Sequence, residues 1–155
     1  MPRYIAVEGP IGAGKTTLAR HLAFALDYPS LFEPVVDNPF LERFYNDHSA
    51  DLALPTQLYF LLHRTQQIAE IPENDLLGPT LITDFLAEKD RIFAEVTLNK
   101  DELALYNQIS SALFKKGPAP DLVIYLQAPV PILKKRIQSR GLHFEQAIET
   151  NYLES

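Results

Sequence analysis

Short apolar runs alternate along the chain with longer segments in which apolar residues recur every three or four positions. The short runs predict strands, of which the last is the clearest buried one, at residues 4–8, 31–33, 80–84 and 121–127. The longer segments predict helices at residues 18–26, 38–45, 54–71, 85–98 and 101–114, and a last helix that starts at Pro129 or Pro131. Strands separated by helices in this way are typical of an α/β fold with a parallel, doubly wound sheet.

The stretch between the first strand and the first helix matches a phosphate-binding motif. Its sequence, G-P-I-G-A-G-K-T-T, fits G-x-x-x-x-G-K-[ST] and has a strand before it and a helix after it, as the motif requires. Backbone N–H groups of such a loop and the helix N-terminus hold a polyphosphate, while the lysine reaches the β- and γ-phosphates and the threonine ligates Mg²⁺. The motif predicts a P-loop NTPase-type fold, a three-layer doubly wound parallel sheet flanked by helices. The residues expected to bind ATP are Gly9, Pro10, Ile11, Gly12, Ala13, Gly14, Lys15, Thr16 and Thr17, with Thr16 on the metal.

Polar side chains follow the predicted strands at the ends where parallel sheets bind ligands. Right-handed crossovers would bring these side chains to one edge beside the phosphate loop, namely Glu8, Glu33, Asp84 and Gln127. Asp84 lies where P-loop enzymes carry the acidic residue that orients Mg²⁺ or its water. An aspartate that ends a strand is also a plain helix cap, since a helical pattern follows it. Both interpretations of Asp84 stay open at this point.

Two pairs of polar residues lie on predicted helices. Gln57 and Arg64 are seven positions apart, close to the apolar stripe of their helix. They are either ordinary helix-surface residues or residues that face a ligand. Arg136 and Arg140 lie one turn apart on the last helix, directly before Gly141. This second pair either belongs to a solvated basic face or closes over transferring phosphates as an arginine clamp.

Composition and charge exclude or disfavour several classes of protein and several kinds of site. The chain has 155 residues, which is the length of one domain. Its formal net charge is -6, which disfavours a nucleic-acid-binding surface. The sequence has no cysteine, which excludes disulfides and thiolate metal sites. No apolar run is long enough to span a membrane and the N-terminus has no targeting pattern, so we expect a cytoplasmic protein.

Further short motifs follow the phosphate loop in a fixed order. They are E-G-P-I-G-A-G-K-T-T from Glu8, Glu33-Pro34-Val35, Phe44-Tyr45, Gln57 with Arg64, Arg91-Ile92-Phe93-Ala94, Tyr125-Leu126-Gln127-Ala128-Pro129, and Arg136-Ile137-x-x-Arg140-Gly141-x-x-x-Glu145. With this set the sequence resembles the deoxynucleoside kinases, the family of deoxycytidine, deoxyguanosine and deoxyadenosine kinases and mitochondrial thymidine kinase. The motifs span nearly the whole chain. The resemblance implies a single P-loop kinase domain over residues 1–155.

The resemblance also implies roles for individual residues. Glu33 would be the general base that takes the proton of the nucleoside 5′-hydroxyl. Tyr45 and Glu145 would hydrogen-bond the sugar 3′-hydroxyl, and Gln57 would read the edge of the nucleobase. Arg64 would support the base site, with help from Asp90. Arg136 and Arg140 would be lid arginines that stabilise transferred charge, and Asp84 would contact the substrate and the metal.

The sequence departs from the family pattern in three ways. Phe85 stands where the family has an arginine after the acidic residue of the third strand, and Leu142 replaces a third lid arginine. The family also continues past residues 152–154 through another helix, a fifth strand and an adenine-contacting loop. We therefore expect this chain to lack that C-terminal segment.

The expected function is transfer of the γ-phosphate of Mg-ATP, or of another nucleoside triphosphate, to the 5′-hydroxyl of a deoxyribonucleoside in nucleotide salvage. By analogy, Arg64 beside Gln57, with Asp90, favours a purine or cytosine base. One alternative is a nucleoside monophosphate kinase of the thymidylate-kinase type, which shares the loop, the sheet and a basic lid. Another is a P-loop switch module that binds nucleotide without a small-molecule acceptor. The resemblance further implies a homodimer paired through helices.

Overall fold

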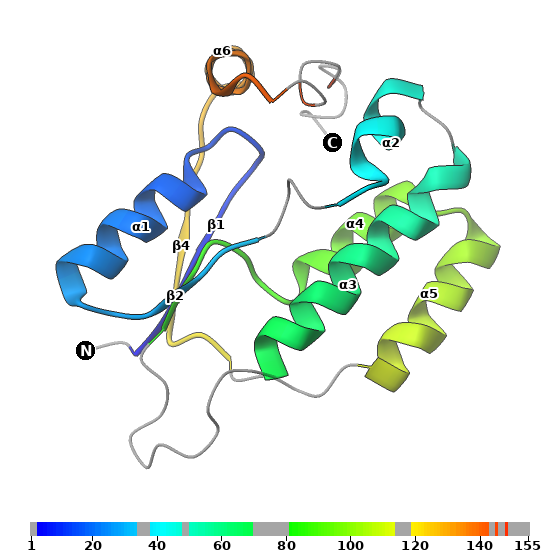
Figure 1. Ribbon diagram of the computed structural model, residues 1–155, viewed down its shortest axis with the longest axis horizontal. Helices are drawn as coiled ribbons and strands as arrows, with labels where there is room; N and C mark the ends of the chain where they lie inside the picture. Colours follow the sequence, from blue (N-terminus) through cyan, green and yellow to red (C-terminus); the bar gives the residue numbers. More distant parts are fainter. Residues whose placement is uncertain are drawn as a thin grey trace. The chain divides into compact units, whose positions relative to one another are not determined.

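The structure is a computed structural model, and its residues form two compact units. It describes residues 3–33, 38–47, 50–69, 81–113, 119–142, 145 and 148. The first unit comprises Met1–Glu33, Pro72–Leu86 and Ala119–Ser155, and the second comprises Pro34–Ile71 and Ala87–Pro118 (Figure 1). The expected loop at residues 70–79 and the expected helix ending at residues 115–118 lie outside the described residues.

The first unit contains a parallel sheet of four strands, as the sequence predicts. The strands are β1 (Tyr4–Glu8), β2 (Ser30–Leu31), β3 (Leu81–Thr83) and β4 (Leu122–Tyr125), in the order β2-β3-β1-β4. Ile5 of β1 is paired with Ile82 on one side and with Leu122 on the other. Because all pairs are parallel, the carboxyl ends of the strands meet at one edge of the sheet.

Two helices of the first unit hold the segment that follows β1. Helix α1 (Lys15–Leu26) packs against the sheet, and its small Ala19 and Ala23 side chains lie in the same buried cluster as Ile5, Val7 and Ile82. Helix α6 (Val130–Arg140) starts with a proline in its first turn, as predicted, because proline needs no N–H partner there. A Cβ placed on Gly12 would lie 2.9 Å from the carbonyl oxygen of Leu133. Helix α6 therefore packs directly against the phosphate loop.

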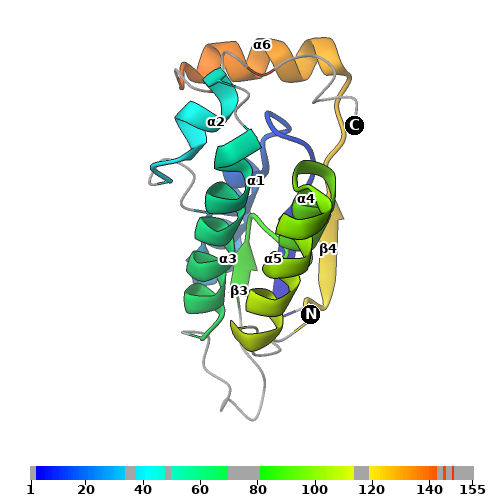
Figure 2. The same ribbon diagram turned by 90° about the vertical axis from the view of Figure 1, so that its right-hand side faces the viewer.

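The second unit is built of helices. These are α2 (Leu41–Asp47), the 3-10 turn η2 (Ala50–Leu52), α3 (Ala53–Ala69), α4 (Lys89–Thr97) and α5 (Lys100–Leu113). Helices α3, α4 and α5 pack side by side (Figure 2). Their shared core contains Ala53, Leu61, Ala94, Leu98 and Tyr106. The helical spacing of apolar residues in the sequence predicted all three of these helices.

The prediction that the last strand is buried is wrong. In β4 the side chains of Leu122 and Val123 are 42% and 43% exposed, and that of Tyr125 is 60% exposed. The strand forms one edge of the sheet in the described residues, with β1 on its other side. A run of apolar residues indicates a strand, but it does not tell a central strand from an edge strand.

Two helices begin later than the sequence predicts. Helix α4 was expected from residue 85 and begins at Lys89. Its expected first turn is held instead by the Glu8 carboxylate, which accepts the Leu86 N–H at 3.1 Å, and by the Phe85 carbonyl, which accepts the Thr83 hydroxyl at 2.8 Å. Helix α2 was expected from residue 38 and begins three residues later, at Leu41.

Side-chain contacts also shorten two predicted elements near their ends. The Asn38 side-chain oxygen accepts the Phe40 N–H at 3.0 Å, which forms a turn before α2. The second strand was expected to reach Glu33 but ends at Leu31. The backbone N–H of Glu33 donates to the Asp84 carboxylate at 2.8 Å, outside the strand ladder.

Candidate active site

The phosphate loop has backbone angles that favour glycine at Gly9, Gly12 and Gly14. Gly9 has a φ of 148° and Gly12 a φ of 79°, values that side chains with a Cβ rarely adopt. A Cβ on Gly9 would lie 2.4 Å from the carbonyl oxygen of Leu126, and this separation is too short for any side chain. The loop thus lies tightly between the end of β4 and the start of α1, and its conformation agrees with the phosphate-binding motif.

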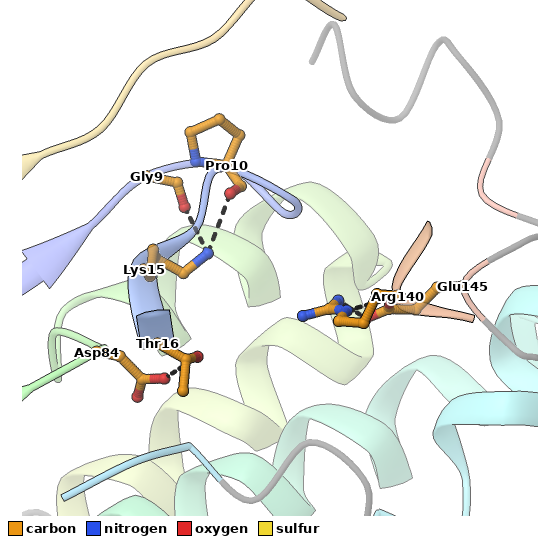
Figure 3. A network of polar contacts seen from close by, with 7 residues as sticks. All are labelled: Gly9, Pro10, Lys15, Thr16, Asp84, Arg140 and Glu145. Atoms are coloured by element: carbon orange, nitrogen blue, oxygen red, sulfur yellow. Dashed lines mark hydrogen bonds and ion pairs between the residues drawn. The ribbon is translucent and has the colours of Figure 1, made fainter. Parts of the chain in front are cut away.

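The side chain of Lys15 turns back over the phosphate loop. Its ammonium group donates to the carbonyl oxygens of Gly9 at 2.8 Å and Pro10 at 3.1 Å (Figure 3). Lys15 is also the first residue of α1, so its charge lies at the positive end of the helix dipole. Two sources of positive potential therefore meet at the mouth of the loop, where an anionic phosphate is favoured.

Asp84 connects the phosphate loop to Glu33. One carboxylate oxygen accepts the Thr16 hydroxyl at 2.5 Å (Figure 3), and the other accepts the backbone N–H of Glu33 at 2.8 Å. Burial raises the pKa of the Asp84 carboxyl, while these two hydrogen bonds and the charge of Lys15 oppose the shift. Asp84 is not a helix cap, because α4 begins at Lys89 and has Glu88 as its N-cap, and its role toward a metal stays a prediction. It joins the residue predicted to bind the metal to the residue predicted to be the base.

Glu8 supports this arrangement in a way that the sequence did not predict. Its buried carboxylate accepts the N–H of Gly9 at 2.9 Å and that of Leu86 at 3.1 Å. One side chain therefore ties the first residue of the phosphate loop to the segment after Asp84. A carboxylate at the end of the first strand was the only sequence signal for this role.

The two arginines of α6 have different partners. Arg136 donates to the carbonyl oxygen of Ala13, within the phosphate loop, at 3.0 Å. Arg140 forms a two-pronged ion pair with Glu145, whose side chain is 1% exposed (Figure 3). Arg136 and Arg140 are exposed like their neighbour Lys135, so the two arginines also belong to a solvated basic face. The clamp interpretation is compatible with Arg136, which already lies against the loop.

The polar residues predicted to read the nucleobase lie in the second unit. Gln57 and Arg64 are 4% and 3% exposed, so they are not helix-surface residues. Arg64 forms an ion pair with Asp90, which is 3% exposed, and its guanidinium lies 5.6 Å from the ring centre of Phe60. The pairing of Arg64 with Asp90 agrees with the relation that the family resemblance implies. Tyr45 is half-buried on α2.

The donor set near Thr16 fits Mg²⁺. This ion prefers oxygen ligands and takes only one or two from the protein, with phosphate and water oxygens completing its shell. The Thr16 hydroxyl and the Asp84 carboxylate offer two such oxygens side by side. Across the described parts of the chain, no group of three or more His, Cys, Asp and Glu residues could hold a metal, and no helix is long and apolar enough to cross a membrane.

The comparison with protein families decides the identity. The family model described as deoxynucleoside kinase matches residues 5–155. The chain belongs to the deoxynucleoside kinase family. Its enzymatic class, an ATP-dependent phosphotransferase, was predicted from the sequence and is confirmed.

Curated relatives agree with this assignment. The chain is 42% identical over 152 residues to a deoxyguanosine kinase of Bacillus subtilis (strain 168), covering 97% of this chain and 73% of that protein. It is 32% identical over 158 residues to a deoxyadenosine/deoxycytidine kinase of the same organism, covering 97% of this chain and 71% of that protein. This deoxynucleoside kinase chain thus spans somewhat less than three quarters of each relative.

Solved structures show the same fold. A deoxyadenosine kinase from M. mycoides with bound dATP has a TM-score of 0.83 and 27% identity, covering 98% of this chain and 78% of that one. The same enzyme with the products dCMP and a flexible dCDP has a TM-score of 0.82 and 28% identity, covering 97% and 77%. The predicted α/β, P-loop kinase fold is therefore confirmed. At the position where the family arginine is missing, Phe85 is 1% exposed, so this deoxynucleoside kinase has an apolar core residue there.

Proposed function

We propose that the protein transfers the γ-phosphate of Mg-ATP, or of another nucleoside triphosphate, to the 5′-hydroxyl of a deoxyribonucleoside, with residues 1–155 acting as one kinase domain. The observation that carries this proposal is the pair of hydrogen bonds to Asp84, from the Thr16 hydroxyl and from the Glu33 backbone. In these hydrogen bonds the Thr16 hydroxyl and the backbone of Glu33 donate to the two oxygens of one carboxylate. Phosphoryl transfer needs that proximity, because it depends on positioning and charge stabilisation.

The donor side of the reaction follows from the phosphate loop. Loop N–H groups and Lys15 would hold the β- and γ-phosphates, while Thr16 and Asp84 would hold Mg²⁺. Held there, the ion would supply neutralisation of the charge that develops during transfer. Arg136, already in contact with Ala13, and Arg140 would stabilise the same charge from α6. Glu33 would accept the proton of the attacking hydroxyl.

The acceptor is proposed to be a deoxyribonucleoside with a purine or cytosine base. The names of the relatives support this choice, since one is a deoxyguanosine kinase and another a deoxyadenosine/deoxycytidine kinase. A buried glutamine amide and a buried guanidinium suit the hydrogen-bonding edges of these bases. Gln57 would read the base, Arg64 with Asp90 would support it, and Tyr45 and Glu145 would bind the sugar 3′-hydroxyl.

A phosphate-transfer assay tests the proposed function. The purified protein with Mg-ATP would be offered each of the four deoxyribonucleosides and each of their monophosphates. We expect transfer to deoxyguanosine, deoxyadenosine or deoxycytidine, little transfer to thymidine, and none to the monophosphates. ATP hydrolysis without transfer to any nucleoside would refute the proposal, and transfer to a monophosphate alone would replace the acceptor by a nucleotide.

We also infer a homodimer, formed through helices of the second unit. Ile92 and Val96 lie one turn apart on α4 and are 61% and 58% exposed, so they lie next to each other on the exposed side of that helix. We expect light scattering to give a mass twice that of the chain, and Ile92→Glu with Val96→Glu to halve it. A monomeric mass for the unaltered protein would contradict this inference. The cytoplasmic location and the role in nucleotide salvage stay predictions of the sequence.

A further inference from the structure

Tyr106 is a buried polar residue that the proposed mechanism does not use. It lies on α5 and is 1% exposed, yet within the described part of the chain its hydroxyl has no hydrogen-bond partner. A buried hydroxyl without a partner has lost its hydration and gained nothing in return. A phenylalanine would fill the same space without that penalty, so the hydroxyl needs an explanation.

The ring of Tyr106 lies in the apolar cluster that also contains Leu61 and Ala94. Leu61 is one turn before Arg64 on α3, and Ala94 is one turn after Asp90 on α4. The tyrosine ring thus packs among residues that neighbour the Arg64–Asp90 ion pair on both helices. All of these residues belong to the second unit.

Two further observations link the hydroxyl to the ion pair. Burial raises the pKa of Tyr106 to about 12, and the positive charge of Arg64 opposes part of that shift, so the guanidinium is close enough to act on the phenol. The hydroxyl therefore keeps its proton at neutral pH and is a donor. Asp90 supplies the matching acceptor, because its Oδ2 atom is buried and receives no hydrogen bond from any described residue.

We propose that Tyr106 is a positioning residue of the nucleobase site: when the nucleoside is bound, its hydroxyl donates to the Asp90 carboxylate and so fixes the guanidinium of Arg64. A guanidinium lies at the end of a long, rotatable side chain, so the position of its carboxylate partner influences the plane of the group. A carboxylate held from two sides keeps the Arg64 guanidinium in one orientation. This inference rests on the proposed function, since it assigns Tyr106 to the reading of the base.

The Tyr106→Phe variant tests the inference, because it removes the hydroxyl and leaves the ring. We expect the KM for the preferred deoxynucleoside to rise about tenfold, the effect of one hydrogen bond to a buried charged group, with kcat within about twofold of the unaltered enzyme. The melting temperature should hold or rise, because an unsatisfied hydroxyl has gone. If the tyrosine served only for packing, the Tyr106→Phe variant would have the KM and kcat of the unaltered enzyme.

Two controls separate the possible outcomes. Tyr125→Phe removes the hydroxyl of a β4 residue that is 60% exposed, and should leave KM and kcat unchanged. In the double variant of Asp90→Ala with Tyr106→Phe, the rise in KM should not exceed that of Asp90→Ala alone, because each change removes the same contact. If the rises in KM of the two single variants multiplied in the double variant, or if Tyr106→Phe left KM unchanged, the inference would be overturned. The proposed function would still hold in that case, provided that the unaltered enzyme phosphorylates a deoxynucleoside. An unaltered enzyme that binds no nucleoside would overturn both.

Discussion

Replacing Glu33 by glutamine is expected to lower kcat about a thousandfold, within the range that general bases contribute, and to leave the KM for the nucleoside within about threefold. The amide keeps the shape of the carboxylate but cannot take the proton of the 5′-hydroxyl. The backbone N–H of Glu33 should still donate to Asp84, since that contact does not involve the side chain. Steady-state kinetics with the preferred deoxynucleoside would measure the two constants separately.

The matched control for this prediction is Glu95→Gln. Glu95 forms an exposed i,i+4 ion pair with Arg91 on α4, and such pairs contribute less than about 0.5 kcal/mol. This control should have normal kcat and nearly normal stability. If Glu33→Gln retained more than about a tenth of the normal kcat, the residue would be no general base, because even a weak base contributes about a hundredfold.

The second large effect is expected for Lys15→Met. The methionine keeps the length of the side chain and removes the ammonium group, so kcat/KM should fall about a thousandfold through loss of charge stabilisation in the transition state. The hydrogen bonds from Lys15 to the carbonyls of Gly9 and Pro10 are also lost, but these carbonyls are part of the loop and can be hydrated. The melting temperature without nucleotide should therefore change little, while stabilisation by ATP should weaken.

Lys135→Met is the control for the loss of a lysine charge. Lys135 is exposed on α6, and its substitution should change neither kcat/KM nor the shift in melting temperature on adding ATP. Thermal melts with and without Mg-ATP, beside the kinetics, would compare the two variants. A Lys15→Met enzyme that kept both its ATP-dependent stabilisation and its rate would remove this lysine from the phosphate site.

Local sequence patterns predicted which helices and strands form better than they predicted the contacts and the exposure of those elements. The glycines, Lys15 and the flanking strand and helix are neighbours in sequence, so their arrangement could be derived from the motif alone. The late start of α4 could not, because it depends on the Glu8 carboxylate, which bonds to the Leu86 N–H across 78 positions. The exposure of β4 also escaped prediction, since its place at the edge follows from the order of the strands.

The candidate site divides in the same way. Residue types and spacing identified Glu33, Asp84 and Arg136 as candidates, and the resemblance to a family added proposed roles for them. The sequence could not say whether Gln57 and Arg64 were exposed, because a helical stripe has no sharp border. Nor did it single out Tyr106, whose aromatic ring fits the apolar pattern of its helix and hides the polar atom.

By itself, the sequence determined the parallel α/β fold, the phosphate loop and the kinase family, because these depend on local geometry and on motifs in a fixed order. The tertiary structure alone decided which atoms meet. Thr16 and Asp84 are 68 positions apart, and Glu33 and Asp84 are 51 apart, yet the three come together at the carboxyl ends of parallel strands. Such contacts are set by strand order and helix packing, which no local pattern encodes. The same holds for the buried Arg64–Asp90 pair, where packing of α3 against α4 brought two charges together out of water.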